Sequence, residues 1–176
     1  MWCPPAFAMI KYEIEDEFET TVDRFWDVFF DDAFNDALWK HLDIERDVFE
    51  FERSGEGPGE RIRRKQRLTP KRDVPAALKR LVKNAISYEE HNEWERGKSL
   101  MTVITIPSFM SDKFDGKGDY KVLEMGPNRV KRVWTASLNC SVPLVGGRVE
   151  SHIVGEVTQS YKDTTTFMRK WLAENG

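Results

Sequence analysis

Alternating apolar and polar residues predict that the chain begins with a β-strand. Over residues 10–18 the apolar side chains fall on almost every second position, which is the period of a half-buried strand. Asp16 interrupts this apolar row near its end. Thr20 or Thr21 then offers an N-cap, and apolar residues recur at helical spacing after it, so we expect a short helix. A second short helix is expected over residues 33–41.

The middle of the chain predicts roughly six more strands, most of them joined by short turns. We expect them at residues 48–53, 60–68, 86–95, 99–106, 120–125 and 129–142. Turns are expected at residues 55–59, 115–118 and 126–128, where glycine, proline, asparagine and aspartate gather. Phe49 and Phe51 are expected to share one face of their strand. Residues 74–84 suit either a short amphipathic helix or a loop.

A single long helix is predicted after Pro143. Apolar residues from 144 to 173 recur at spacings of three and four and form a continuous stripe, while charged residues occupy the other face. About 28 helical residues would extend roughly 42 Å, enough to cross a sheet. Because a sheet with one apolar face needs a second layer over it, we predict an α+β fold. In it, a curved antiparallel sheet of about seven strands wraps around the C-terminal helix.

The strand predicted over residues 86–95 carries polar groups on its inward face. Tyr88 and Trp94 mark that face as apolar, and the same alternation brings Glu90 and Asn92 inside. A buried carboxylate is costly unless it is paired or hydrated. We therefore expect either a charged partner for Glu90 or a splayed edge strand on which Glu90 is solvated.

The neighbouring strand offers that partner. Arg64 and Gln66 alternate onto the same face as Ile62 and Leu68. A Glu90–Arg64 pair inside a water-containing cavity would orient the polar end of a ligand held between apolar walls. We therefore predict that Tyr88, Trp94, Asn92, Glu90, Arg64 and Gln66 bind a ligand.

Two other regions add candidate ligand-binding residues. His152 and Tyr161 lie on the apolar stripe of the long helix, where a histidine either faces a cavity or is simply packed and hydrogen-bonded. Phe109 lies in an apolar segment over residues 106–114. That segment would form either a lid, a tip that touches a membrane, or a part of the core.

The outward faces of these strands carry opposite charges. Arg61, Arg63, Lys65 and Arg67 would face Glu89, Glu93 and Glu95. We expect weak cross-strand ion pairs on a solvated face. Transient contact of the basic strand with an anionic membrane is the alternative.

Composition narrows the class of protein. The 176 residues include 40% hydrophobic and 12% aromatic residues, which suits one domain with a large core. We expect this domain over residues 9–176, with residues 1–8 as an N-terminal extension, because Met9 immediately precedes the first strand. The net charge of −3 and the absence of a dominant basic face argue against a nucleic-acid partner.

The cysteines and histidines predict neither a metal site nor a disulfide framework. Cys3 and Cys140 are far apart in sequence, and the histidines lack the spacing of metal ligands. No phosphate loop, dinucleotide fingerprint or Ser-His-Asp arrangement is visible. We therefore expect no cofactor and a cytoplasmic location.

The order of elements from Met9 to Leu172 resembles the START-like superfamily, also called SRPBCC, which includes proteins of the birch-pollen-allergen type. A specific point of likeness is the entry to the last helix, Ser-Val-Pro-Leu-Val-Gly-Gly-Arg-Val-Glu at residues 141–150, with Trp171-Leu172 near its end. This junction is similar to an uncharacterised bacterial START-like family and to sterol-binding domains of contact-site transfer proteins. The resemblance implies a helix-grip fold whose cavity binds a lipid-like or polycyclic molecule, either for binding alone or for transport.

Two other functions remain open at this level. Some START-like relatives are enzymes of the cyclase or hydratase kind, and Glu90, His152 and Tyr161 are the candidate acid–base groups for such chemistry in the same cavity. An interaction module whose interior is filled by aromatic side chains is the third possibility. The sequence predicts no particular oligomeric state.

Overall fold

The computed structural model describes residues 10–71, 87–108, 111, 114–140 and 146–175. For residues 10, 114–115, 138–140 and 146–153 it describes the backbone but not the surroundings of the side chains. The helix or loop expected over residues 74–84 lies outside the described residues.

Seven strands form one antiparallel sheet. They are β1 (Ile10–Phe18), β2 (Ile44–Ser54), β3 (Arg61–Pro70), β4 (Tyr88–Glu95), β5 (Leu100–Pro107), β6 (Phe114–Gly126) and β7 (Arg129–Cys140). Their order across the sheet is β1-β7-β6-β5-β4-β3-β2. Strands β2 to β7 thus follow one another as a meander, and β1 pairs with the last strand. The predicted antiparallel sheet is confirmed.

The first helix begins at one of the two predicted caps, and the second begins one residue before its predicted start. Helix α1 (Val22–Phe29) is capped by Thr21, whose hydroxyl oxygen accepts a bond from Arg24 N at 3.2 Å. Helix α2 (Asp32–His41) is capped by Asp31, whose carboxylate accepts from Phe34 N at 2.7 Å. Helix α3 runs without interruption over Gly146–Glu174, so the predicted long C-terminal helix is confirmed.

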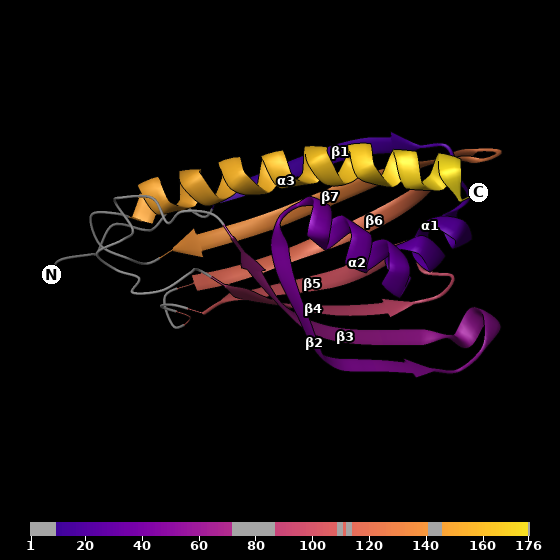
Figure 1. Cartoon of the computed structure of the whole chain (residues 1–176), viewed down its shortest axis with the longest axis horizontal. Coiled ribbons are helices and arrows are strands. Elements are labelled where there is room, and N and C mark those ends of the chain that lie inside the picture. Colours follow the sequence, from indigo (N-terminus) through magenta and orange to yellow (C-terminus); the bar gives the residue numbers. More distant parts are fainter. Residues whose placement is uncertain (1–9, 72–86, 109–110, 112–113, 141–145, 176) are drawn as a thin grey trace, which may run out of the picture.

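All three helices lie on the same, concave face of the curved sheet (Figure 1). Helix α3 packs against β1 and β7, α1 packs against β6, and α2 contacts β2 and α3. An aromatic cluster fills the space beneath α1, where Trp26 contacts Phe25, Phe30, Trp94 and Tyr120. This is the helix-grip architecture that the resemblance implies. A short 3₁₀ turn at Gly57–Gly59 joins β2 to β3.

The prediction of a turn at residues 115–118 is wrong, because these residues lie inside β6. A β-carbon on Gly116 would lie 3.1 Å from the carbonyl oxygen of Thr105, and one on Gly118 would lie 3.0 Å from that of Thr135. Glycine inside a strand often marks such a close approach of backbones. Gly118 also leaves room on the inner face for the Trp134 indole, whose Nε1 would lie 3.3 Å from a β-carbon at this position.

Phe49 and Phe51 do not share a face as predicted. The register of β2 against β3 shifts at Phe49, which leaves it unpaired in a bulge. Its ring lies near the outward-facing Arg67 and His91, at 5.8 and 6.4 Å. Phe51 instead pairs with Arg64, which faces inward.

Candidate ligand-binding site between the sheet and the C-terminal helix

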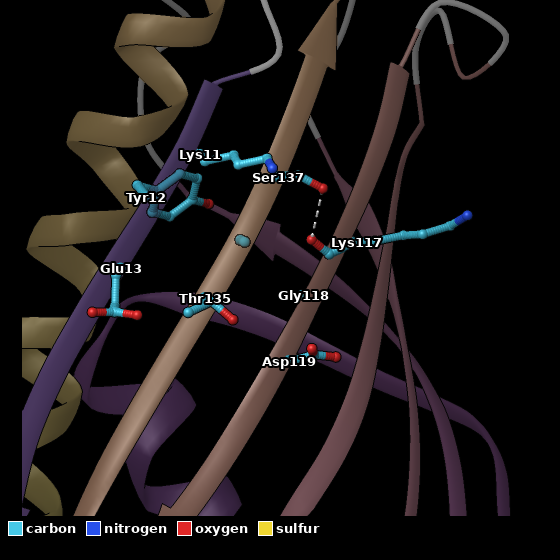
Figure 2. A pocket seen from close by; sticks show the side chains of 9 residues that line it. Lys11, Tyr12, Glu13, Lys117, Gly118, Asp119, Thr135 and Ser137 are labelled. Atoms are coloured by element: carbon cyan, nitrogen blue, oxygen red, sulfur yellow. Dashed lines mark hydrogen bonds between the residues drawn. The ribbon is translucent and has the colours of Figure 1, made fainter.

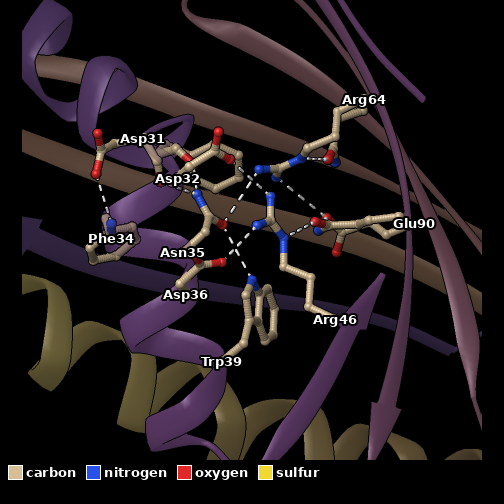
Figure 3. A network of polar contacts seen from close by, with 12 residues as sticks. Asp31, Asp32, Phe34, Asn35, Asp36, Trp39, Arg46, Arg64 and Glu90 are labelled. Carbon is tan, nitrogen blue, oxygen red and sulfur yellow. Dashed lines mark hydrogen bonds and ion pairs between the residues drawn. The ribbon is translucent and has the colours of Figure 1, made fainter. Parts of the chain in front are cut away.

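A network of polar side chains surrounds Arg64 on the inner face of β3 (Figure 3). The side chain is 1% exposed. Its Nε donates to Asn92 Oδ1 at 3.0 Å, its Nη1 donates to Asn35 Oδ1 at 3.4 Å, and its Nη2 lies 3.9 Å from Glu90 Oε1. Burial lowers the pKa of Arg64 to about 10, and the charge of Glu90 opposes this effect. The predicted Glu90–Arg64 pair is therefore present.

The same network continues to α2 and the edge strand β2. Gln66 Nε2 donates to Glu90 Oε1 at 3.1 Å and its own Oε1 accepts from Arg46 Nε at 2.9 Å. Arg46 also forms ion pairs with Asp32 at 3.7 Å and Asp36 at 3.5 Å. The network thus joins the sheet to the second short helix, and every nitrogen of the Arg64 guanidinium has a partner.

A second buried arginine, Arg132, lies on the inner face of β7. It pairs in register with Asp16 of β1, and its Nη2 donates to the Asp16 carboxylate and to Thr165 Oγ1 of α3, the latter at 2.8 Å. The residue is 0% exposed. Within the described part of the chain, Arg132 Nε and Nη1 have no hydrogen-bond partner.

Aromatic rings surround the Arg132 guanidinium. Its central carbon lies 5.4 Å from the ring centre of Phe18, 5.7 Å from Tyr120 and 4.9 Å from Tyr161. Burial raises the pKa of Tyr161 well above its ordinary value and also raises that of Tyr120. Burial acts to lower the pKa of Arg132, but Tyr120 and Asp16 favour its charged form, and the pKa is raised. The site therefore contains one cation among neutral phenols.

Next along the inner face of β7, Trp134 stacks on Tyr161, with ring centres 4.7 Å apart. Its Nε1 is buried without a partner and lies 3.3 Å from the position of a β-carbon on Gly118. Ala136 follows and pairs with both Gly118 and Tyr12. The small residues Gly118 and Ala136 thus form a floor directly beside the hydrogen-bond donors of Arg132 and Trp134.

The interior is closed at one end and less tightly covered at the other. On α3, Thr165, Met168 and Leu172 are buried, whereas Val154, Val157 and Tyr161 are only partly buried. The inner face of the sheet shows the same change. It is buried at Val122 and Met101. It is only partly buried at Thr105, Gly116, Gly118 and Ala136. Helix and sheet therefore cover each other less completely toward the N-terminal half of α3.

The structure brings only some of the predicted ligand-binding residues together. Arg64, Gln66, Glu90 and Asn92 form one network, and Tyr161 lies in the separate cluster around Arg132. Glu90 keeps 19% of its side chain exposed.

The other predicted residues lie elsewhere. Trp94 belongs to the aromatic cluster with Trp26 and Phe30, and Tyr88 is a partly buried residue packed at the edge of the core. Phe109 lies outside the described residues. The backbone of His152 is part of α3, but the surroundings of its side chain are not described.

The sequence interpretation missed the ion pair between the buried Arg132 and the partly buried Asp16. Val130, Arg132 and Trp134 alternate onto one face of β7, just as Asp16 stands in the inner row of β1. Each of these two opposite charges interrupts an apolar row of its strand. That pattern could have been used to predict that the two strands pair.

A hollow of about 520 Å³ spans the neighbouring strands β1, β7 and β6 (Figure 2). It is lined by Lys11, Tyr12, Glu13, Lys117, Gly118, Asp119, Thr135, Ala136 and Ser137. Among the described residues, none of those predicted to bind a ligand lines this hollow. Most of its lining residues alternate onto the sheet face opposite Tyr12 and Ala136.

The outer face carries the predicted cross-strand ion pairs. Arg61 pairs with Glu95 at 3.2 Å, Arg63 with Glu93 at 3.4 Å, and Arg67 with Glu89 at 2.9 Å. Among the described residues, no group of His, Cys, Asp and Glu side chains is arranged to hold a metal ion. No helix in the described part of the chain has the length and apolar character to cross a membrane.

Comparison with solved structures identifies the fold. The chain is similar to an aromatase/cyclase of Streptomyces sp. R1128, with a TM-score of 0.61 and 12% identity over 93% of each chain. It is also similar to a norcoclaurine synthase of Thalictrum flavum solved with a transition-state analogue, with a TM-score of 0.61 and 15% identity over 98% of this chain and 100% of the other. A START superfamily protein of Mycobacterium smegmatis has a TM-score of 0.56 and 10% identity, over 96% and 99% of the two chains.

Sequence comparison places the chain more narrowly. No curated protein matches it significantly. Residues 13–172 match a family described as protein of unknown function, DUF2505. The chain has the START-like helix-grip fold and belongs to the DUF2505 family.

Proposed function

We propose that the chain binds a hydrophobic small molecule, lipid-like or polycyclic, between the inner face of the sheet and helix α3. The observation that carries the proposal is the paired loss of burial at one end of the interior. Both the apolar stripe of α3 and the inner sheet face are buried at one end and partly exposed at the other. A largely apolar concave surface with a few polar groups is the usual form of a small-molecule site.

The walls of this space suit a flat or elongated apolar molecule. Tyr12, Trp134 and Tyr161 present rings beside the small-residue floor at Ala136 and Gly118. Aromatic side chains bury a large area against a ligand and stack on flat rings. The aromatase/cyclase named above forms rings according to its name, and a norcoclaurine synthase of Thalictrum flavum was solved with dopamine and hydroxybenzaldehyde, which supports a ring-containing ligand.

Binding of the neutral fluorescent probe N-phenyl-1-naphthylamine tests the proposal. We expect saturable binding with one site per chain, weakened at least about tenfold by Ala136→Leu, because the added atoms occupy the space above the floor. Thr135→Leu is the matched control, since its side chain points to the opposite sheet face and should leave the affinity unchanged. Non-saturable binding, or equal effects of the two substitutions, would refute the proposal.

A further inference from the structure

The buried polar atoms without partners share one property: all are hydrogen-bond donors. Within the described residues they are Trp26 Nε1, Asn92 Nδ2, Trp94 Nε1, Arg132 Nε, Arg132 Nη1 and Trp134 Nε1. Buried donors are almost always paired in folded proteins, and leaving one unpaired costs about 1–3 kcal/mol. By distance and angle the described chain supplies no acceptor for these N–H groups, although the Tyr120 hydroxyl lies near enough to Arg132 to favour its charged form.

Two of these residues are neighbours on β7. Arg132 and Trp134 are separated by one residue and both face inward, toward the floor that begins at Ala136. Arg132 lies deepest, enclosed by rings, and Trp134 Nε1 lies above Gly118. We infer that Arg132 and Trp134 donate hydrogen bonds to acceptor oxygens of the ligand, and that the ligand is an apolar carbonyl compound. The inference rests on the proposed function.

The geometry of the guanidinium argues against a single carboxylate held in a fork. The Asp16 carboxylate and Thr165 Oγ1 already occupy Nη2. The free N–H groups belong to Nε and Nη1, which point along different edges of the planar group. Each of them can therefore donate to a separate oxygen of the ligand or to a water molecule, but they do not form a fork together.

The charge balance points to a neutral acceptor. Asp16 already compensates the charge of Arg132, and Glu90 lies in the same interior opposite Arg64. An anionic ligand would add a buried negative charge without a partner, which is costly. A ketone or quinone oxygen accepts hydrogen bonds without adding charge, and it needs no acceptor from the protein. The surplus of donors matches that chemistry.

A set of ligands with one skeleton tests the inference. Fluorene, 9-fluorenone and fluorene-9-carboxylate have the same fused rings and differ at one carbon. We expect the wild-type chain to bind fluorenone at least about tenfold more tightly than fluorene, because a hydrogen bond from a charged donor is strong in a buried site. The carboxylate should bind more weakly than the ketone.

Substitutions identify the donors. Arg132→Lys keeps a cation for Asp16 but removes Nε–H and Nη1–H, and Trp134→Phe removes the indole N–H while keeping a ring. Each should reduce the preference for fluorenone over fluorene by at least about threefold. Trp94→Phe is the control, because it removes an unpartnered indole N–H from the cluster around Trp26, away from β7.

The outcomes separate the inference from the proposed function. Three results would overturn the inference and leave the proposed function standing. The first is equal affinity of the wild-type chain for fluorene and fluorenone, and the second is tighter binding of the carboxylate than of the ketone. The third is an unchanged preference for fluorenone over fluorene in both β7 variants. If none of the three compounds binds, while N-phenyl-1-naphthylamine does, the carbonyl class is also wrong. If neither the set nor that probe binds, the proposed function fails and the inference fails with it. Should Arg132→Lys not fold, Trp134→Phe decides.

Discussion

Arg64 and Arg132 are equally buried and differ in how completely they are bonded. Arg64 has partners for all its nitrogens and joins β3 to β4 and to Asn35 of α2. Arg132 uses Nη2 alone, and its remaining nitrogens face aromatic rings. A fully paired guanidinium stabilises one arrangement of the fold, even though Asn92 Nδ2 beside Arg64 has no partner among the described residues. A partly paired guanidinium leaves room for something else to bind. The comparison assigns Arg64 to structure and Arg132 to the site.

The two regions also differ in what surrounds them. The Arg64 guanidinium lies 5.1 Å from the rings of both Phe29 and Phe30, at the closed junction of the short helices. Arg132 lies below α3, on the strand that leads to Ala136 and the less covered end of the interior. On β3, every nitrogen of the buried guanidinium therefore has a partner. On β7, the buried guanidinium keeps nitrogens without a partner.

The largest expected effect separates the two arginines by stability. Arg64→Met should lower the free energy of unfolding by about 3–5 kcal/mol, because it removes the partner of Glu90 and leaves Asn92 Oδ1 without its donor. Arg132→Met should cost only about 1–3 kcal/mol, because the loss at Asp16 is offset by removing two unpaired donors. Urea unfolding of both variants measures the difference. A loss at Arg132 equal to or larger than that at Arg64 would reverse the assignment.

The tyrosines beside Arg132 predict a dependence of stability on high pH. Because burial raises the pKa of Tyr161 and Tyr120, the folded chain holds these phenolic protons to higher pH than an unfolded chain, which loses them near pH 10. Their contribution to stability is complete below about pH 10 and decreases as the pH rises further, with a limiting slope of about 1.4 kcal/mol per pH unit for one tyrosine.

Urea unfolding between pH 9 and pH 11 measures this slope, and Tyr161→Phe should make it shallower by the share of one tyrosine. Phenylalanine keeps the ring that stacks on Trp134. An unchanged slope in the variant would mean that Tyr161 titrates normally in the folded chain.

The smallest effect concerns an exposed arginine, which sharpens the contrast with the buried pair. Arg63 and Glu93 form an ion pair at 3.4 Å on the outer face, with side chains that are 53% and 69% exposed. A double-mutant cycle with Arg63→Ala and Glu93→Ala should give a coupling below about 1 kcal/mol, decreasing with salt. A coupling of several kcal/mol would show that burial does not decide the strength of arginine pairs in this sheet.

Much of the fold follows from periodicity. The alternation in β3 and β4 correctly placed Arg64, Gln66, Glu90 and Asn92 on one inner face, and the spacing of three and four correctly gave one uninterrupted α3. Local pattern was enough in these cases, because the strands are neighbours in sequence as well as in space.

Pattern failed where a long-range pairing or a backbone irregularity decides the geometry. Asp16 and Arg132 stand opposite each other although the strands that carry them are the first and the last in the chain. Gly116 and Gly118 have the composition of a turn, and only the approach of β5 and β7 explains their place inside a strand. The bulge at Phe49 shifts the register and reverses the face of one aromatic ring.

A crystal structure of the chain with 9-fluorenone would show directly which face of the sheet holds the ligand. We expect the fused rings between α3 and the inner sheet face, above Ala136 and Gly118, with the carbonyl oxygen within hydrogen-bond distance of Trp134 Nε1 or of a free nitrogen of Arg132. Fluorenone bound instead in the hollow beside Lys11 and Lys117, or an interior in which Arg132 and Trp134 contact only water while the ligand is bound elsewhere, would contradict it.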